Sequence, residues 1–250
     1  MDKLFSQLQR LYLMPGTTPA EQNRQGLVSL VSGEGLLRAI VIDFPILQGG
    51  AAEQHWTNLC AVANALQETF GFPAPAVSIT GDSGYRLWLS LADPIPEQDA
   101  RRFVALLGEA HFPDMVLPIS EQLQLPPAVS PASGKWAAFI HPGMGASFAE
   151  EAGLEVEPPA HAQLAFLEGL ESIAKAQFEV ALASLQQKDA AVAAMPVPAP
   201  VAEGLLLKDA TLEDIVRHLH ALNIEPTFRH LLPRRAQADR MVHHLPPEER

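Results

Sequence analysis

The sequence predicts an α+β fold, in which a core sheet is flanked by helices and followed by a short C-terminal helical appendage. Three observations lead to this prediction. Short apolar runs typical of strands are interspersed with longer segments of helical periodicity. Of the 250 residues, 48% are hydrophobic and 18% are charged, so a sizeable core can be buried. A Pro/Ala-rich stretch near residue 195 then separates the last helical segment from the rest.

Two helices and a buried strand are expected first. Residues 4–12 repeat apolar side chains at helical spacing, and Pro15 and Gly16 stop that helix. Residues 19–32 are expected to form a second helix. Residues 36–42 are nearly all apolar, which is typical of a strand buried on both faces.

A helix and two strands are expected next. Residues 51–70 place apolar side chains three and four positions apart and end at a glycine suited to cap a helix. Residues 77–80 form a short strand, which completes a strand–helix–strand unit. Residues 85–91 alternate strictly, so Arg86 and Trp88 share one face of their strand and the leucines share the other.

The rest of the sequence predicts three helices and one strand. Residues 97–110 form a helix after an Asp-Pro-Ile-Pro start, and residues 136–140 form a strand. Residues 161–187 are expected to form one long helix. Residues 211–222 form a compact helix, whose Thr-x-x-Asp start resembles a capping box with Asp in place of Glu.

These elements divide the chain into three parts. Residues 1–187 are expected to form the α+β domain. Residues 188–203 are expected to form a semi-rigid Pro/Ala linker. Residues 204–250 are expected to form a helical appendage with a frayed tail, whose arginines could touch a phosphate backbone or an acidic partner, or simply be solvated.

The composition limits the classes of function. The net charge of −12 argues against avid, sequence-independent binding to nucleic acid. The single cysteine, Cys60, cannot form an internal disulfide and lies in a helical apolar pattern, as buried thiols do. The first residues are expected to form an amphipathic segment instead of a signal peptide, and the longest apolar run, residues 190–202, is interrupted by prolines. We therefore expect a soluble, cytoplasmic protein with no membrane partner.

Familiar catalytic motifs are missing from the sequence. It contains no Cys-x-x-Cys, His-Glu-x-x-His or Gly-x-Ser-x-Gly pattern and no P-loop. The nine histidines show no spacing typical of metal ligands. A zinc enzyme, an α/β-hydrolase and a P-loop NTPase are therefore poorly supported.

The first candidate site residue is Asp43, an acid at the end of a buried strand. This is a position where sheets expose ligand groups, so Asp43 is a weak candidate metal ligand. The alternative is an acid that caps a turn or pairs with an arginine.

A second candidate site follows about forty residues later, in the turn formed by residues 80–84. The backbone N–H groups of Gly81, Ser83 and Gly84 are suited to cradle a phosphate, although any hairpin turn has a similar composition. Arg86 and Trp88 follow on one strand face and could clamp a phosphate and stack a base or sugar. The alternative is an Arg–aromatic pair on a partly wet sheet face.

The order of these motifs resembles the core of the archaeo-eukaryotic primase superfamily, the primase-polymerases of replication proteins, plasmids and mobile elements. Asp43-Phe44-Pro45 is similar to that family's Asp-x-Asp, and Ser83-Gly84-Tyr85-Arg86 to its Ser-Gly-x-Gly-Tyr-His signature. Asp114 is our match for a third family acid on a later strand. Residues 130–135, which end in Lys135, are similar to the stretch before the family's last strand. The resemblance covers about residues 36–173.

Two departures from the family pattern change what the resemblance implies. Pro45 stands where the family has a second carboxylate, and proline cannot bind the metal ions of phosphoryl transfer. Arg86 stands where the family has the histidine that meets nucleotide phosphates, and arginine can still bind phosphate. The resemblance therefore implies a degenerate site without polymerase activity, with Asp43, Arg86 and Asp114 as relic positions and Lys135 beside the cleft.

Two other hypotheses stay open. The first is an active nucleotidyltransferase that uses Mg²⁺ or Mn²⁺ and recruits Glu53, Asp82 or Asp114 beside Asp43. The second is a non-catalytic protein that binds a protein partner through residues 161–187 or the C-terminal tail, which the acidic charge favours.

Overall fold

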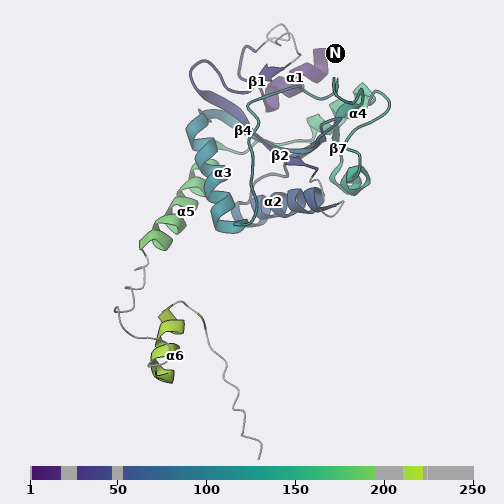
Figure 1. The fold of residues 1–250 in the computed structure, drawn as a ribbon. Coiled ribbons are helices and arrows are strands. Elements are labelled where there is room, and N and C mark those ends of the chain that lie inside the picture. Colours follow the sequence, from purple (N-terminus) through teal and green to yellow (C-terminus); the bar gives the residue numbers. More distant parts are fainter. Residues whose placement is uncertain (1, 18–26, 47–52, 195–210, 222–223, 225–250) are drawn as a thin grey trace, which may run out of the picture. The chain divides into compact units, whose positions relative to one another are not determined.

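The computed structural model describes residues 2–17, 27–46, 53–194, 211–221 and 224 (Figure 1). The chain divides between Ala194 and Met195 into two compact units, which are described separately here. None of the helices in these ranges is long and apolar enough to cross a membrane.

The first unit is built on a five-stranded antiparallel sheet, which confirms the mixed α+β class. A second, two-stranded sheet lies beside it. In spatial order, the large sheet consists of β2 (Leu36–Pro45), β4 (Gly84–Pro96), β3 (Ala76–Ile79), β7 (Trp136–Ile140) and β6 (Ala128–Val129), and the small sheet of β1 (Val28–Ser29) and β5 (Gln122–Leu123).

The chain order of the core is that of a split β-α-β motif. β2, α2 (Gln54–Phe70) and β3 form the strand–helix–strand unit that the sequence predicts, and β4 lies between its two strands. After α3 (Glu97–His111), Ile119 forms an antiparallel bridge with Ile42. The chain therefore returns along the outer edge of β2.

Both faces of the sheet are covered. One face packs against α2, α3 and α5 (Lys175–Ala194) and includes Leu87 and Leu89, while the other includes Trp88 and packs against α1 (Asp2–Leu11) and α4 (Ala160–Glu168). Figure 1 shows α2 and α1 on opposite sides of the sheet. The predicted alternation along β4 is thus confirmed, and both of its faces are covered around Leu87, Trp88 and Leu89.

A buried glutamine closes part of one sheet edge. The side-chain amide of Gln163, on α4, donates to the carbonyl oxygen of Phe139 at 2.9 Å and accepts from the backbone N–H of Phe139 at 2.9 Å. Gln163 therefore makes the pair of bonds that a neighbouring strand would make with β7 at this residue.

The expectation of one helix over residues 161–187 is wrong. α4 ends at Glu168 and α5 begins at Lys175. Between them, Ile173 donates its N–H to the carbonyl of Ser90 at 2.8 Å and accepts from the N–H of Ala92 at 2.9 Å. The backbone of this segment is bonded to β4, so it cannot at the same time close helical hydrogen bonds.

The expectation of a helix over residues 19–32 is also wrong where the structure can test it, because Val28 pairs with Leu123 of β5. Val28 and Leu30 are both buried and lie two positions apart, which is the spacing of one strand face and not of one helix face. Residues 18–26 lie outside the described residues.

The boundary of the first unit is later than expected, because residues 188–194 continue α5 instead of beginning a linker. Residues 195–210 and 225–250, which include the rest of the expected linker and the tail, lie outside the described residues. In the second unit, α6 (Leu212–Ala221) has the predicted capping box: Thr211 N–H donates to Asp214 Oδ2 at 3.0 Å, and Asp214 N–H donates to Thr211 Oγ1 at 3.2 Å.

Two histidines, His55 on α2 and His111 on α3, each bury one ring nitrogen without a hydrogen-bond partner among the described residues. The Nε2 atoms of His55 and His111 are buried without a donor or acceptor, and the His55 ring stacks on Tyr85 with centroids 5.1 Å apart. Burial lowers the pKa of His55, and burial followed by the charge of Lys188 lowers the pKa of His111.

The protein is expected to lose stability as the pH falls below about 6.5, the ordinary histidine pKa. The unfolded chain takes up protons there, while the lowered pKa values of both folded histidines shift their protonation to lower pH. The free energy of unfolding should therefore fall by up to about 1.4 kcal/mol per pH unit for each histidine. Urea denaturation between pH 7.5 and 5 measures the slope. A His55→Phe, His111→Phe double variant should have a flatter profile, and an unchanged slope would contradict the assignment.

Candidate functional site

Asp43 and Arg86 form an ion pair across two neighbouring strands. They are direct partners in the register of β2 and β4, and Arg86 Nε lies 2.8 Å from Asp43 Oδ1. The other carboxylate oxygen accepts a hydrogen bond from the hydroxyl of Ser120, on the segment that borders β2. Both oxygens of Asp43 are therefore engaged by protein groups, as in the alternative reading of this acid.

A pocket of about 270 Å³ lies beside this pair. It is lined by charged groups of both signs, by hydroxyls and amides, and by a few apolar side chains. The lining residues are Leu27, Thr80, Asp82, Arg86, Gln122, Leu123, Gln124, Ser130, Pro131 and Ala137.

The turn of residues 80–84 uses its own backbone N–H groups. Thr80 Oγ1 accepts from the N–H groups of the residues at positions 82, 83 and 84 at 2.8 to 3.4 Å. The N–H of Gly81 donates to the carbonyl oxygen of Ala152 at 2.7 Å. The expected phosphate cradle at Gly81, Ser83 and Gly84 is therefore corrected, since these donors already have internal acceptors.

Asp82 presents a fixed negative charge at the pocket. Its Oδ2 accepts from the Ser130 hydroxyl at 2.7 Å, and its Oδ1 accepts from the Thr80 hydroxyl at 3.1 Å. Burial raises the pKa of Asp82, but the hydrogen bonds from Ser130, Ser83 and Thr80 outweigh burial and leave the pKa below its ordinary value. The carboxylate is thus ionised at neutral pH.

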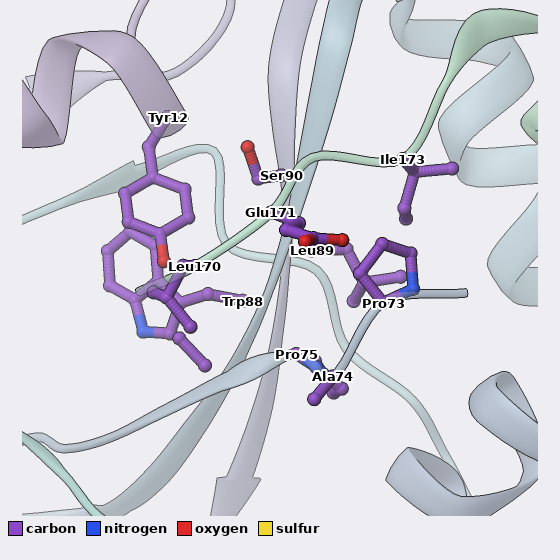
Figure 2. A pocket seen from close by; sticks show the side chains of 11 residues that line it. Tyr12, Pro73, Ala74, Pro75, Trp88, Leu89, Ser90, Leu170, Glu171 and Ile173 are labelled. Carbon is purple, nitrogen blue, oxygen red and sulfur yellow. The ribbon is translucent and has the colours of Figure 1, made fainter. Parts of the chain in front are cut away.

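Trp88 cannot stack on a ligand, which corrects the expectation for this residue. Its side chain is only 1% exposed, and its ring lies 4.9 Å from that of Tyr12 and 5.4 Å from that of Phe139, measured between centroids. Its Nε1 donates to Ser78 Oγ at 2.8 Å. Figure 2 shows Trp88 beside Tyr12 at a cavity of about 10 Å³, which has room for about one water molecule.

Lys135 does not line the pocket beside Arg86. Its ammonium group pairs with Glu155, with Nζ and Oε1 3.0 Å apart, and also with Glu151. These two carboxylates neutralise the charge of Lys135, so a phosphate would have to compete with them for its ammonium group.

The other acids do not join Asp43. Asp114 lies exposed in a turn after α3 and not on a strand, which corrects its expected position. Glu53 is exposed at the start of α2. Within the described ranges, no group of three or more histidine, cysteine, aspartate or glutamate residues could hold a metal ion.

Sequence reasoning missed the hydroxyl partners of the two carboxylates. Ser120 and Ser130 reach Asp43 and Asp82 from segments 77 and 48 residues away in the chain, so no local pattern reveals them. Thr80 is the exception, because its spacing from Asp82 is that of a side chain that closes a turn. Neither a protein-family model nor a curated protein shows a significant match to this sequence.

Proposed function

We propose that this chain is a cytoplasmic, primase-polymerase-like protein of a replication or mobile-element setting, which binds a nucleotide or a nucleic-acid end without polymerase activity. The observation that carries the proposal is the pocket beside Arg86. Asp43 and Arg86, the residues that the resemblance singles out, are far apart in the sequence but are paired across β2 and β4, and Arg86 lines the pocket. Their juxtaposition supports a common site.

The surroundings of Asp43 support the loss of polymerase activity. Two-metal phosphoryl transfer needs several carboxylates that converge on both ions. Both oxygens of Asp43 are bonded to Arg86 and Ser120, and Pro45 offers no ligand at the second position. An active enzyme would have to break the ion pair and bring another acid to this place.

The charge of the site favours a short ligand. A groove that follows a phosphate backbone usually carries several unpaired cations. Here Arg86 is accompanied by two carboxylates, and Lys135 is paired with two glutamates. The pocket therefore suits one nucleotide or one chain end better than an extended strand.

Replacing Arg86 with alanine is expected to abolish nucleotide binding, because Arg86 is the only cation among the described residues that line the pocket. Calorimetric titration with nucleoside triphosphates, with and without Mg²⁺ or Mn²⁺, measures the effect. Arg102→Ala, at an exposed position of α3, is a control for the loss of one positive charge. If Arg86→Ala does not fold, Arg86→Lys is measured in its place, because lysine keeps a positively charged partner for Asp43.

Two results would overturn the proposal. Unchanged binding in a folded Arg86→Ala protein would remove the site. Metal-dependent incorporation of labelled nucleotide, lost in Asp43→Ala, would show that the chain is an active nucleotidyltransferase.

A second candidate function is protein interaction through α5, which we favour less. Val180 on this helix is 70% exposed, so its side chain is accessible to a partner. Binding to a defined protein partner, lost in Val180→Asp, together with no nucleotide binding, would favour this function.

A further inference from the structure

The helix α6, in the second unit, carries an apolar face beside a charged one. Its apolar side chains recur three and four positions apart, which places them on one side of the helix: Leu212, Ile215, Val216 and Leu219. Leu212 is 61% exposed, and the other three are half-buried. A helix of ten residues is marginal in water by itself, since isolated helices need about 12–15 residues. We therefore expect α6 to gain stability when another apolar surface covers this face.

The residue pattern of α6 is self-complementary when it is read backwards. From Leu212 to Leu219 the sequence is Leu-Glu-Asp-Ile-Val-Arg-His-Leu. The apolar positions are symmetric about the middle of this segment, whereas two acids precede the middle and two basic residues follow it. A surface that binds a second copy of itself across a two-fold axis needs this property, because residue i of one copy contacts residue j of the other and the reverse.

The charges favour an antiparallel pair of α6 helices over a parallel pair. In a parallel pair, Glu213 would lie beside Glu213 of the second copy, and these like charges would repel each other. In an antiparallel pair, the acidic first turn of one helix lies beside the last turn of the other, which holds His218 and His220. The helix dipoles are then also opposed, so the positive end of each helix lies beside the negative end of the other.

Glu213 and His220 are the side chains best placed to set this orientation. Both are exposed, and they are nearly two helical turns apart, so they lie on the same flank of the apolar face. When two apolar faces meet in antiparallel order, Glu213 of one helix lies close to His220 of the other. Asp214 is already engaged within its own helix, because it accepts from the N–H of Thr211 at 3.0 Å and lies 3.2 Å from Nη1 of Arg217. Glu213 has only a longer contact of 3.7 Å with Arg217.

We infer that α6 binds α6 of a second copy of this chain as an antiparallel pair of helices, with Leu212 of each helix packed against Leu219 of the other. A helix of ten residues is about 15 Å long, so the buried surface falls below the about 1,200 Å² of stable interfaces. The association is therefore weak and reversible. The inference is independent of the proposed function, since it uses only residues of the second unit.

Sedimentation equilibrium of the full chain over a wide range of concentrations tests the inference. The average mass is expected to rise with concentration from that of one chain toward that of two. Ile215→Asp places a charge in the apolar face and should abolish this rise. Val180→Asp is the matched control, because it makes a similar change at an exposed position of the first unit and should leave the rise unchanged.

Two charge variants test the antiparallel order. Glu213→Lys and His220→Glu should each raise the dissociation constant about two- to fivefold, because each places like charges beside one another at both ends of the pair. An equimolar mixture of the two variants, with one of them fluorescently labelled, should associate at least as tightly as the unchanged chain. In the mixed pair, the two substitutions complement each other at one end and the native residues meet at the other.

Three results would each overturn the inference. The first is a chain that stays monomeric up to the highest concentration reached. The second is self-association that persists in Ile215→Asp, which would place the contact on another surface. The third is a mixture of the charge variants that associates no more tightly than either variant alone. Nucleotide binding that is lost in Arg86→Ala would support the proposed function in all three cases.

Discussion

Replacing Gly84 with alanine is expected to leave little or no folded protein. Gly84 has a φ of +143°, and a Cβ atom there would lie 2.3 Å from the carbonyl oxygen of Phe44. The obstacle is backbone of β2, so it cannot move without separating β2 from β4, where Gly84 pairs with Pro45. We expect a loss of about 4 kcal/mol or more out of a typical total of about 5–15 kcal/mol.

Soluble yield and urea denaturation measure this loss, and Gly134 provides the matched control. Gly134 also has a positive φ, +75°, but a Cβ atom there would meet nothing within 4 Å. Gly134→Ala should therefore show only backbone strain, about 1–3 kcal/mol. Equal stability of the two alanine variants would show that β2 and β4 do not approach each other as closely at Gly84 as described here.

Replacing Trp88 with alanine is expected to lower the free energy of unfolding by about 3–5 kcal/mol, as for other buried aromatic side chains. The ring is enclosed by Tyr12 and Phe139, and its N–H is bonded to Ser78. Urea denaturation at neutral pH measures the loss.

A double-mutant cycle separates the ring of Trp88 from its hydrogen bond. Trp88→Phe keeps an aromatic ring but leaves the Ser78 hydroxyl without its donor, and Ser78→Ala removes the acceptor; the coupling between them should be about 0.5–1.5 kcal/mol. If Trp88→Ala cost less than about 1 kcal/mol and also abolished nucleotide binding, Trp88 would be a ligand-stacking residue instead of a core residue.

Trp88 also shows how far periodicity predicts this fold. Alternation along residues 85–91 correctly places Arg86 and Trp88 on the same face of β4, because strand geometry is local. Whether that face is wet depends on α1 and α4, which are about 80 residues away on either side in the sequence. The sequence pattern therefore predicts the shared face but not its burial.

The site was predictable to a similar extent. Asp43 was identified from its position at the end of one predicted strand and Arg86 from its position at the start of another, and the two side chains form an ion pair. Pairing of Asp43 with an arginine was the alternative that the sequence left open, but the identity of that arginine and the hydrogen bond from Ser120 depend on distant segments and could not be predicted. The same holds for residues 161–187, where helical spacing continues but Ile173 is bonded to β4.

The amide of Gln163 has a consequence for how this protein behaves in a crowded solution. An open strand edge can recruit an identical edge from another molecule and begin aggregation. Gln163 occupies both hydrogen-bonding groups of Phe139 on β7, and the segment around Ile119 borders β2 at the opposite side of the sheet. Side-chain and loop groups thus take the places that foreign strands would otherwise fill, which discourages edge-to-edge association between copies of the chain.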